Sequence, residues 1–217
     1  MALEQMRPYY DQDGIVIYHG DCREICDSVY GDLLCTDPPY GISYKGGSGG
    51  NLIHSKGKRR QEKVIGDDQP FDPAPFLPNP YVALFGAQHF YDRLPPGGTF
   101  HIWDKRADYE PVHTADFDTV WVNRKEVSRK FRCVWRGLCR ETEHMEMIVH
   151  PTQKPIVVML WVLEMFPSAR SVLDPFMGSG TTLVAAKNLG RKAIGIEIEE
   201  KYCEIAAKRL AQGVLAL

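Results

Sequence analysis

An aspartate, two prolines and a tyrosine, Asp37 to Tyr40, follow one of the apolar segments of the chain. Proline fixes the backbone φ angle and has no N–H group, so Pro38 and Pro39 make this a rigid stretch whose carbonyl oxygens have preset directions. The Asp37 carboxylate and the Pro38 carbonyl are therefore two preset hydrogen-bond acceptors, and Tyr40 offers a flat ring for stacking. This combination suits a planar group with an exocyclic amino group, which has two hydrogens to donate. The simpler alternative is an ordinary proline-rich turn with a surface aspartate.

A second candidate site is the glycine-rich turn Asp174-Pro-Phe-Met-Gly-Ser-Gly-Thr-Thr182, which leads from an apolar segment into a helical pattern. Glycines let the backbone approach a ligand, and the N–H groups that begin a helix favour a negative group. Thr181 stands where a P-loop needs lysine, and Leu183 replaces the third glycine of a dinucleotide motif. Glu197, at the end of the next predicted strand, is suited to bind both hydroxyls of a ribose. We therefore predict an adenosine-type cofactor at this turn.

The elements that must position these residues are short apolar segments alternating with helical patterns. The segments lack polar alternation, which favours strands of a sheet covered on both faces, at residues 14–18, 32–36, 81–85, 99–103, 118–122, 171–173 and 192–198. Helices are predicted at residues 155–166, 181–189 and 199–210. This alternation indicates an α/β fold built on a doubly wound sheet.

The formal net charge of the 217 residues is only −2, which argues at first against a polyanionic partner. Residues 41–70 and 123–140 nevertheless contain 13 of the 26 Lys and Arg residues; together they carry +9, against −11 elsewhere. Charge runs are usually solvated surface. We interpret these two as a divided cationic face on an acidic body, because net charge says nothing about where the charges lie. The glycine-rich, basic stretch 41–69 is too poor in apolar residues to form core, so we predict a mobile loop that contacts substrate.

Several classes of protein are not expected. No apolar run reaches the about 18 residues of a membrane-spanning helix, and the N-terminus lacks a signal-peptide pattern, so a cytoplasmic protein without a membrane partner is predicted. The six cysteines are expected to be reduced thiols. Their spacings do not match a zinc motif, so no metal is expected.

The two motifs, together with His150-Pro-Thr-Gln-Lys-Pro155, resemble the S-adenosylmethionine-dependent amino-methyltransferases of DNA. The acceptor motif precedes the cofactor turn, as in the circularly permuted beta group of this family. The resemblance covers nearly the whole chain and implies a single Rossmann-like methyltransferase domain over residues 1–217, with a mostly parallel sheet and an antiparallel strand. Compact enzymes of phages and prophages are similar in style.

The resemblance also implies a reaction and roles for individual residues. The methyl group would go to the exocyclic amino group of a flipped-out DNA base, and Asp rather than Ser at position 37 indicates adenine N6 rather than cytosine N4. Catalysis would depend on Asp37, Pro38, Pro39 and Tyr40. Glu197 would bind the ribose hydroxyls, Asp21 and Cys22 would border the adenine ring, and Thr152 and Lys154 would reach the methionine carboxylate. The other cofactor contacts would be Asp174, Phe176, Gly178, Ser179, Gly180 and Thr181.

The basic segments would bind DNA phosphates, and an arginine among them would also suit a guanine edge. The candidate residues are Lys45, Lys56, Lys58, Arg59, Arg60, Arg124, Lys125, Arg129, Lys130, Arg132 and Arg136. Members of the beta group carry a target-recognition domain where this chain has only residues 123–149, which predicts a short or relaxed recognition site. A homodimer and an accompanying restriction enzyme are both compatible with the resemblance.

Other functions share parts of these motifs. Methylation of cytosine N4 in DNA, of adenine in RNA and of a protein glutamine amide all use similar acceptor motifs. The permuted motif order and the two basic segments favour DNA. A catalytically inactive DNA-binding subunit would be expected to lack Asp37, Tyr40 or the glycine pair, and all of these residues are present.

Overall fold

The computed structural model describes residues 7–44, 64–106, 115–136, 139–143, 150 and 152–211, and of Arg136 and Cys139 it describes only the backbone. One sheet has the strand order β1-β2-β11-β10-β3-β4-β6-β5-β7. Its strands are β1 (Tyr10–Gln12), β2 (Ile15–His19), β3 (Leu33–Thr36), β4 (Tyr81–Phe85), β5 (Thr99–Asp104), β6 (Phe117–Val122), β7 (Lys130–Arg132), β10 (Ser171–Asp174) and β11 (Lys192–Glu197). Strands β8 (Trp135–Arg136) and β9 (Cys139–Arg140) form a separate ribbon. Every strand predicted from an apolar segment is present.

The centre of the sheet is parallel. Strands β2, β11, β10, β3 and β4 pair in parallel, whereas β6 lies antiparallel between β4 and β5. The edge strand β1 is also antiparallel to its neighbour β2, and β7 is parallel to β5. The predicted mostly parallel sheet with an antiparallel strand is therefore confirmed.

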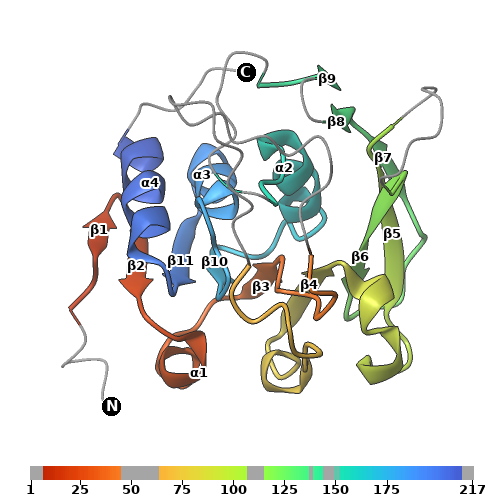
Figure 1. Ribbon diagram of the computed structural model, residues 1–217, viewed down its shortest axis with the longest axis horizontal. Coiled ribbons are helices and arrows are strands. Elements are labelled where there is room, and N and C mark those ends of the chain that lie inside the picture. The colour runs from red at the N-terminus through yellow and green to blue at the C-terminus, as the bar shows by residue number, and fades with distance from the viewer. Residues whose placement is uncertain are drawn as a thin grey trace.

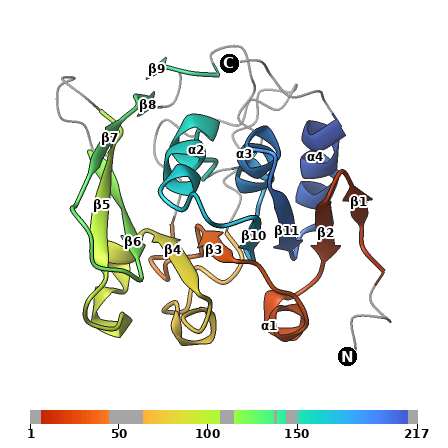
Figure 2. The ribbon, with the colours of Figure 1, turned by 180° about the vertical axis from the view of Figure 1, so that it is seen from behind.

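Helices cover both faces of this sheet (Figures 1 and 2). On one face lie α2 (Ile156–Glu164), α3 (Thr181–Asn188) and α4 (Glu200–Ala211), which are the three helices predicted from the sequence. On the other face lie the short α1 (Cys22–Ile25) and the 3-10 turns η2 (Cys26–Ser28), η3 (Ala74–Phe76), η4 (Ala87–His89) and η5 (Tyr91–Arg93). Two apolar cores result, one beneath each layer. This is the three-layer arrangement of a doubly wound α/β fold.

Strand β5 departs from the expectation that every strand is covered on both faces. His101 and Trp103 are buried, but Phe100 and Ile102 on the opposite face are 38% and 37% exposed. Buried and exposed side chains therefore alternate along this strand. Because the exposed side chains are also apolar, this alternation could not be recognised from the sequence. Within the described ranges, no helix combines the length and apolar character needed to span a membrane.

Candidate active site

The two predicted motifs meet where the strand order of the sheet reverses. Strand β3 ends immediately before Asp37, and β10 ends at Asp174; the two strands are adjacent and parallel. The Thr36 hydroxyl donates a hydrogen bond of 2.6 Å to Asp174 Oδ1. From this point the chain winds outward in opposite directions, through β11 on one side and β4 on the other. Ligands of open α/β sheets bind at such a switch point, beyond the carboxyl ends of the strands.

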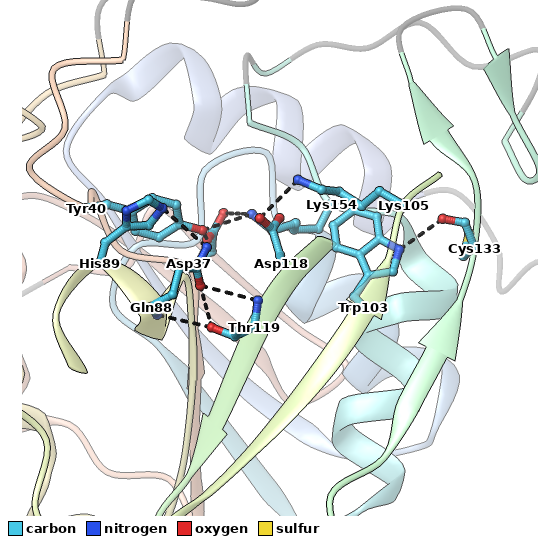
Figure 3. Close-up of polar contacts among 10 residues, drawn as sticks. All are labelled: Asp37, Tyr40, Gln88, His89, Trp103, Lys105, Asp118, Thr119, Cys133 and Lys154. Carbon is cyan, nitrogen blue, oxygen red and sulfur yellow. Dashed lines mark hydrogen bonds and ion pairs between the residues drawn. The ribbon is translucent and has the colours of Figure 1, made fainter. Parts of the chain in front are cut away.

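The carboxylate of Asp37 is held by two side chains. The Tyr40 hydroxyl donates to Oδ1, and the Lys154 ammonium forms an ion pair with Oδ2 (Figure 3). Lys154 Nζ also lies 3.5 Å from the Tyr40 hydroxyl oxygen. The aspartate is thus fixed as a hydrogen-bond acceptor at the end of β3, and Lys154 joins it from a motif 117 positions further along the chain.

The ring of Tyr40 is fixed by the segment that follows β4. His89 stacks on it, with 5.0 Å between the ring centroids and an interplanar angle of 19° (Figure 3). Gly86 lies so close that a Cβ atom there would be 2.0 Å from Tyr40 Cε1. Burial and the nearby carboxylates of Asp37 and Asp118 raise the pKa of Tyr40 well above its ordinary value. The phenol therefore remains neutral, as a hydrogen-bond donor to Asp37 must.

A second ion pair lies beside this group. Lys105 Nζ, just after β5, is 3.0 Å from Asp118 Oδ1 at the start of β6 (Figure 3). The two strands are antiparallel, which brings the end of one to the beginning of the other. Neighbouring Thr119 accepts a 3.1 Å hydrogen bond from the backbone N–H of Gln88 and so anchors the turn that carries His89. None of these four side chains was singled out from the sequence as part of the site, because nothing local marks them.

The cofactor turn has the shape that its glycines predict. Gly178 and Gly180 have positive φ angles of 51° and 79°. Glu197 accepts hydrogen bonds from the backbone N–H groups of Gly178 (3.0 Å) and Glu199 (2.8 Å), and its burial raises the pKa of the carboxyl. Arg209, from α4, bonds to the Ser179 carbonyl and to the hydroxyls of Ser179 and Thr181 at 2.8, 3.3 and 3.1 Å. A half-buried carboxylate and the glycine-rich turn thus lie side by side.

Asp174 is the most deeply buried carboxylate of the site, with 2% of its surface exposed. Burial raises the pKa of Asp174 from 3.8 to about 6, against the opposing effect of hydrogen bonds from Thr182, Thr36 and the Phe176 amide. The folded protein therefore holds a proton on Asp174 at pH values where the unfolded chain has released it. The protonated Asp174 therefore contributes to the free energy of unfolding. This contribution is complete below pH 3.8 and is lost as the pH rises through about 6.

We expect Asp174→Asn, which keeps the shape but cannot ionise, to remove this dependence. Between about pH 5 and about pH 7.5, the wild type should lose about 1.4 kcal/mol more unfolding free energy than the variant. Urea unfolding of both proteins at the two pH values measures the difference. Equal losses in the two proteins would contradict the assignment.

The remaining residues predicted at the cofactor lie in four places. Asp21 is the N-cap of α1 and pairs with the exposed Arg23, while Cys22 is buried beneath it. The Thr152 hydroxyl lies 3.2 Å from His150 Nδ1. Phe176 packs edge-on against Phe71 and Phe76 at centroid distances of 5.9 and 5.6 Å. Lys154, predicted at the methionine carboxylate, contacts the Asp37 carboxylate.

The predicted substrate loop is described only at its two ends. Asp67 is 4% exposed and accepts backbone N–H groups of Gly41, Ile42 and Tyr44 at 2.9, 3.3 and 2.5 Å. The buried aspartate therefore ties the start of the loop to its end, directly after Tyr40. The predicted mobility and the predicted DNA-binding residues Lys45, Lys56, Lys58, Arg59 and Arg60 lie outside the described residues.

The second basic segment divides into two kinds of residue. Lys125, Arg129, Lys130 and Arg132 are exposed, and the last two approach Asp104 at 3.6 and 3.5 Å. The Arg124 guanidinium instead donates to the Met165 carbonyl at 2.6 Å, pairs with Glu126 and covers the Phe166 ring. Arg124 thus attaches the end of β6 to the end of α2, and its guanidinium is already used within the protein. The Arg136 side chain lies outside the described part.

Sequence comparison identifies the family. A model of N6/N4 DNA methylases matches residues 99–208, which is more than half of the chain. The chain belongs to this family. The type II methyltransferase M2.LlaDCHI of Lactococcus lactis subsp. cremoris is 26% identical over 255 aligned residues, covering 95% of this chain and 93% of the relative. M2.DpnII of Streptococcus pneumoniae is also 26% identical, over 94% of this chain and 92% of the relative.

Solved methyltransferases share the fold. The PvuII DNA methyltransferase, specific for cytosine N4, matches 98% of this chain and 92% of its own with a TM-score of 0.61 and 16% identity. The M1.HpyAVI complex with S-adenosylmethionine matches 91% of this chain and all of its own, with a TM-score of 0.55 and 23% identity. At these identities the similarity shows the architecture alone.

This methyltransferase acts on DNA and takes its methyl group from S-adenosylmethionine. The residues at the switch point fit that donor. Gly178 and Gly180 have positive φ angles and no side chains, so a ligand at the ends of β10 and β11 can approach the backbone directly. A side chain at Gly178 would also be crowded, because its Cβ atom would lie 3.3 Å from His150 Nε2. The Glu197 carboxylate lies at the end of the second strand, β11, which is where nucleotide-binding folds of this kind carry an acidic residue for ribose hydroxyls.

Proposed function

We propose that this enzyme methylates the exocyclic N6 amino group of a flipped-out adenine in DNA, with Asp37, Pro38 and Tyr40 in contact with the base. The observation that carries the proposal is the position of Asp37. It lies at the end of β3, next to the cofactor strand β10, and its carboxylate is already fixed by two side chains. The aspartate at position 37 supports adenine over cytosine, because adenine-specific members of the family resemble this chain in having aspartate at this position of the motif.

The amino nitrogen of adenine is a poor nucleophile because its lone pair is delocalised into the ring. Hydrogen bonds from its two hydrogens to the Asp37 carboxylate and the Pro38 carbonyl would localise the lone pair on nitrogen. They would also aim it at the cofactor turn across the β3–β10 boundary. S-adenosylmethionine supplies an electrophilic methyl group. As the N–C bond forms, the bond between the methyl carbon and the donor's sulfur would break and leave a neutral thioether. One amino proton must also leave, and the Asp37 carboxylate, hydrogen-bonded to the amino group, is placed to accept it.

A base inside a duplex cannot reach a pocket at the edge of a sheet, so the target must leave the helix and stack in the site. Tyr40 provides the stacking ring. Since His89 already stacks on this ring, the base would use the opposite face or displace His89. The glycine-rich turn and Glu197 would hold the adenosyl group, with Arg209 supporting the turn from behind. The exposed cations Lys125, Arg129, Lys130 and Arg132 would bind phosphates.

Incubation with isotope-labelled S-adenosylmethionine and either DNA or RNA, followed by nucleoside analysis, tests the proposal. We expect labelled N6-methyladenine from DNA, with activity that falls steeply as salt increases because phosphate contacts release counterions. Sequencing of the methylated DNA then gives the recognition site. Label in N4-methylcytosine would refute the choice of base, and label in RNA alone would refute the choice of substrate.

A further inference from the structure

Lys154 is a buried lysine whose only role in the mechanism above is to help fix the Asp37 carboxylate. It is 8% exposed, forms an ion pair with Asp37 and lies 3.5 Å from the Tyr40 hydroxyl oxygen. Its Nζ is also 5.5 Å from the centre of the Phe85 ring. Burying an ammonium group is costly unless it is paired and hydrogen-bonded, so a lysine in this position requires a specific set of partners.

The chemistry of the target base suggests one further partner. Next to its amino group, adenine has the ring nitrogen N1, which accepts a hydrogen bond; the amino group and N1 thus form a donor–acceptor pair on one edge. Asp37 and Lys154 form the complementary pair, an acceptor and a donor held against each other. An ammonium group has three N–H bonds. Among the residues that the structure describes, Asp37 and Tyr40 account for two of these N–H bonds, which leaves one for the base.

We propose that Lys154 is a specificity-determining residue that donates a hydrogen bond to adenine N1 while Asp37 accepts from the adjacent amino group. This inference rests on the proposed function and adds to it a direct reading of the base edge. Cytosine offers the same pair through N3 and its amino group. Guanine and thymine carry a hydrogen on the corresponding ring nitrogen, which would face the ammonium donor to donor. The pocket would therefore exclude them even before the amino group is considered.

The test is a double-mutant cycle between the lysine and the base. Duplexes carry, at the methylated position, adenine or 1-deazaadenine, which keeps the amino group but replaces N1 with C–H. Each is methylated by the wild type and by Lys154→Met, and kcat/KM is compared. We expect the wild type to lose about 10- to 100-fold on 1-deazaadenine, as for a lost hydrogen bond to a charged group. Lys154→Met should lose a similar factor on adenine and little more on 1-deazaadenine.

Controls separate this role from others. 7-Deazaadenine retains N1, so the ratio of its kcat/KM to that of adenine should be the same for the wild type and for Lys154→Met. Lys208→Met, at an exposed lysine of α4, should behave as the wild type with all three bases. Calorimetry should give the same S-adenosylmethionine affinity for Lys154→Met and the wild type; a large loss would assign Lys154 to the methionine carboxylate and overturn the proposal. The proposal would also be overturned if the loss in kcat/KM for Lys154→Met on 1-deazaadenine equalled the product of the two single losses. Equal kcat/KM of the wild type on adenine and on 1-deazaadenine would overturn it as well. If the wild type does not methylate ordinary adenine, it is the proposed function that fails.

Discussion

We expect the Asp37→Ala variant to lose methyl transfer almost completely, by at least about 10³-fold in kcat. The substitution removes the acceptor that localises the amino lone pair and takes up the proton. It also leaves Lys154 buried without its counterion. Binding of S-adenosylmethionine should largely survive, because the glycine-rich turn and Glu197 are untouched. Methyl incorporation into DNA and calorimetric titration of the cofactor measure the two effects separately.

Two further variants make this prediction sharp. Asp37→Asn keeps the volume and one acceptor oxygen but loses the charge, so it should fold better than Asp37→Ala and still transfer methyl groups slowly. Asp92→Ala removes an exposed carboxylate on the η5 turn and should leave activity unchanged. Full activity in folded Asp37→Ala would exclude Asp37 from catalysis.

The second large effect is expected at Gly86. An alanine Cβ there would lie 2.0 Å from Tyr40 Cε1 and 2.1 Å from Cζ, so the ring would have to move away from Asp37. Tyr40 is also the proposed stacking surface for the base. We therefore expect Gly86→Ala to lower kcat/KM on DNA by about 10- to 100-fold, which corresponds to the loss of the stacking of one base. The affinity for S-adenosylmethionine should change far less. Steady-state kinetics with DNA and with the cofactor as the varied substrate distinguish the two.

Gly190 provides a matched control. Its φ angle is 65°, against 66° for Gly86, but nothing lies within 4 Å of a Cβ built on it. Alanine at either position pays the strain of a left-handed backbone, about 1–2 kcal/mol, and only at Gly86 does it also displace Tyr40. Both variants should therefore lose stability, and only Gly86→Ala should lose activity beyond that. Equal activity of the two would show that the position of Tyr40 is not critical.

The sequence by itself predicted the elements of the fold and its two motifs. Central strands such as β3 and β4 are apolar throughout. Helices α2 and α3 follow Pro155 and a Gly-Ser-Gly turn, and α4 has apolar residues at helical spacing. These are local properties, so no tertiary information is needed to recognise them. The short elements β1, α1, β7, β8 and β9 were not predicted, because two to four residues carry too little periodicity.

The contacts between distant segments could not be predicted from the sequence. Charge counts placed Asp67 in a basic loop, whereas the structure buries it as the hydrogen-bond acceptor that joins the two ends of that loop. Arg124 belongs to a basic run, yet its guanidinium bonds to the end of α2. In each case the side chain is directed by a partner far away along the chain, and composition contains no information about that partner.

The chemistry of the site was therefore determined by the sequence, and its assembly by the tertiary structure. Asp37-Pro-Pro-Tyr40 and the glycine turn carry the groups that we propose recognise the base and the cofactor, because residue type and backbone stiffness are properties of a few neighbouring residues. Only the parallel pairing of β3 with β10 places these motifs side by side. Only the packing of α2 beside the sheet brings Lys154, which precedes that helix, to Asp37 at the end of β3. A side chain that precedes a helix can point in more than one direction, and long-range packing decides which group it contacts.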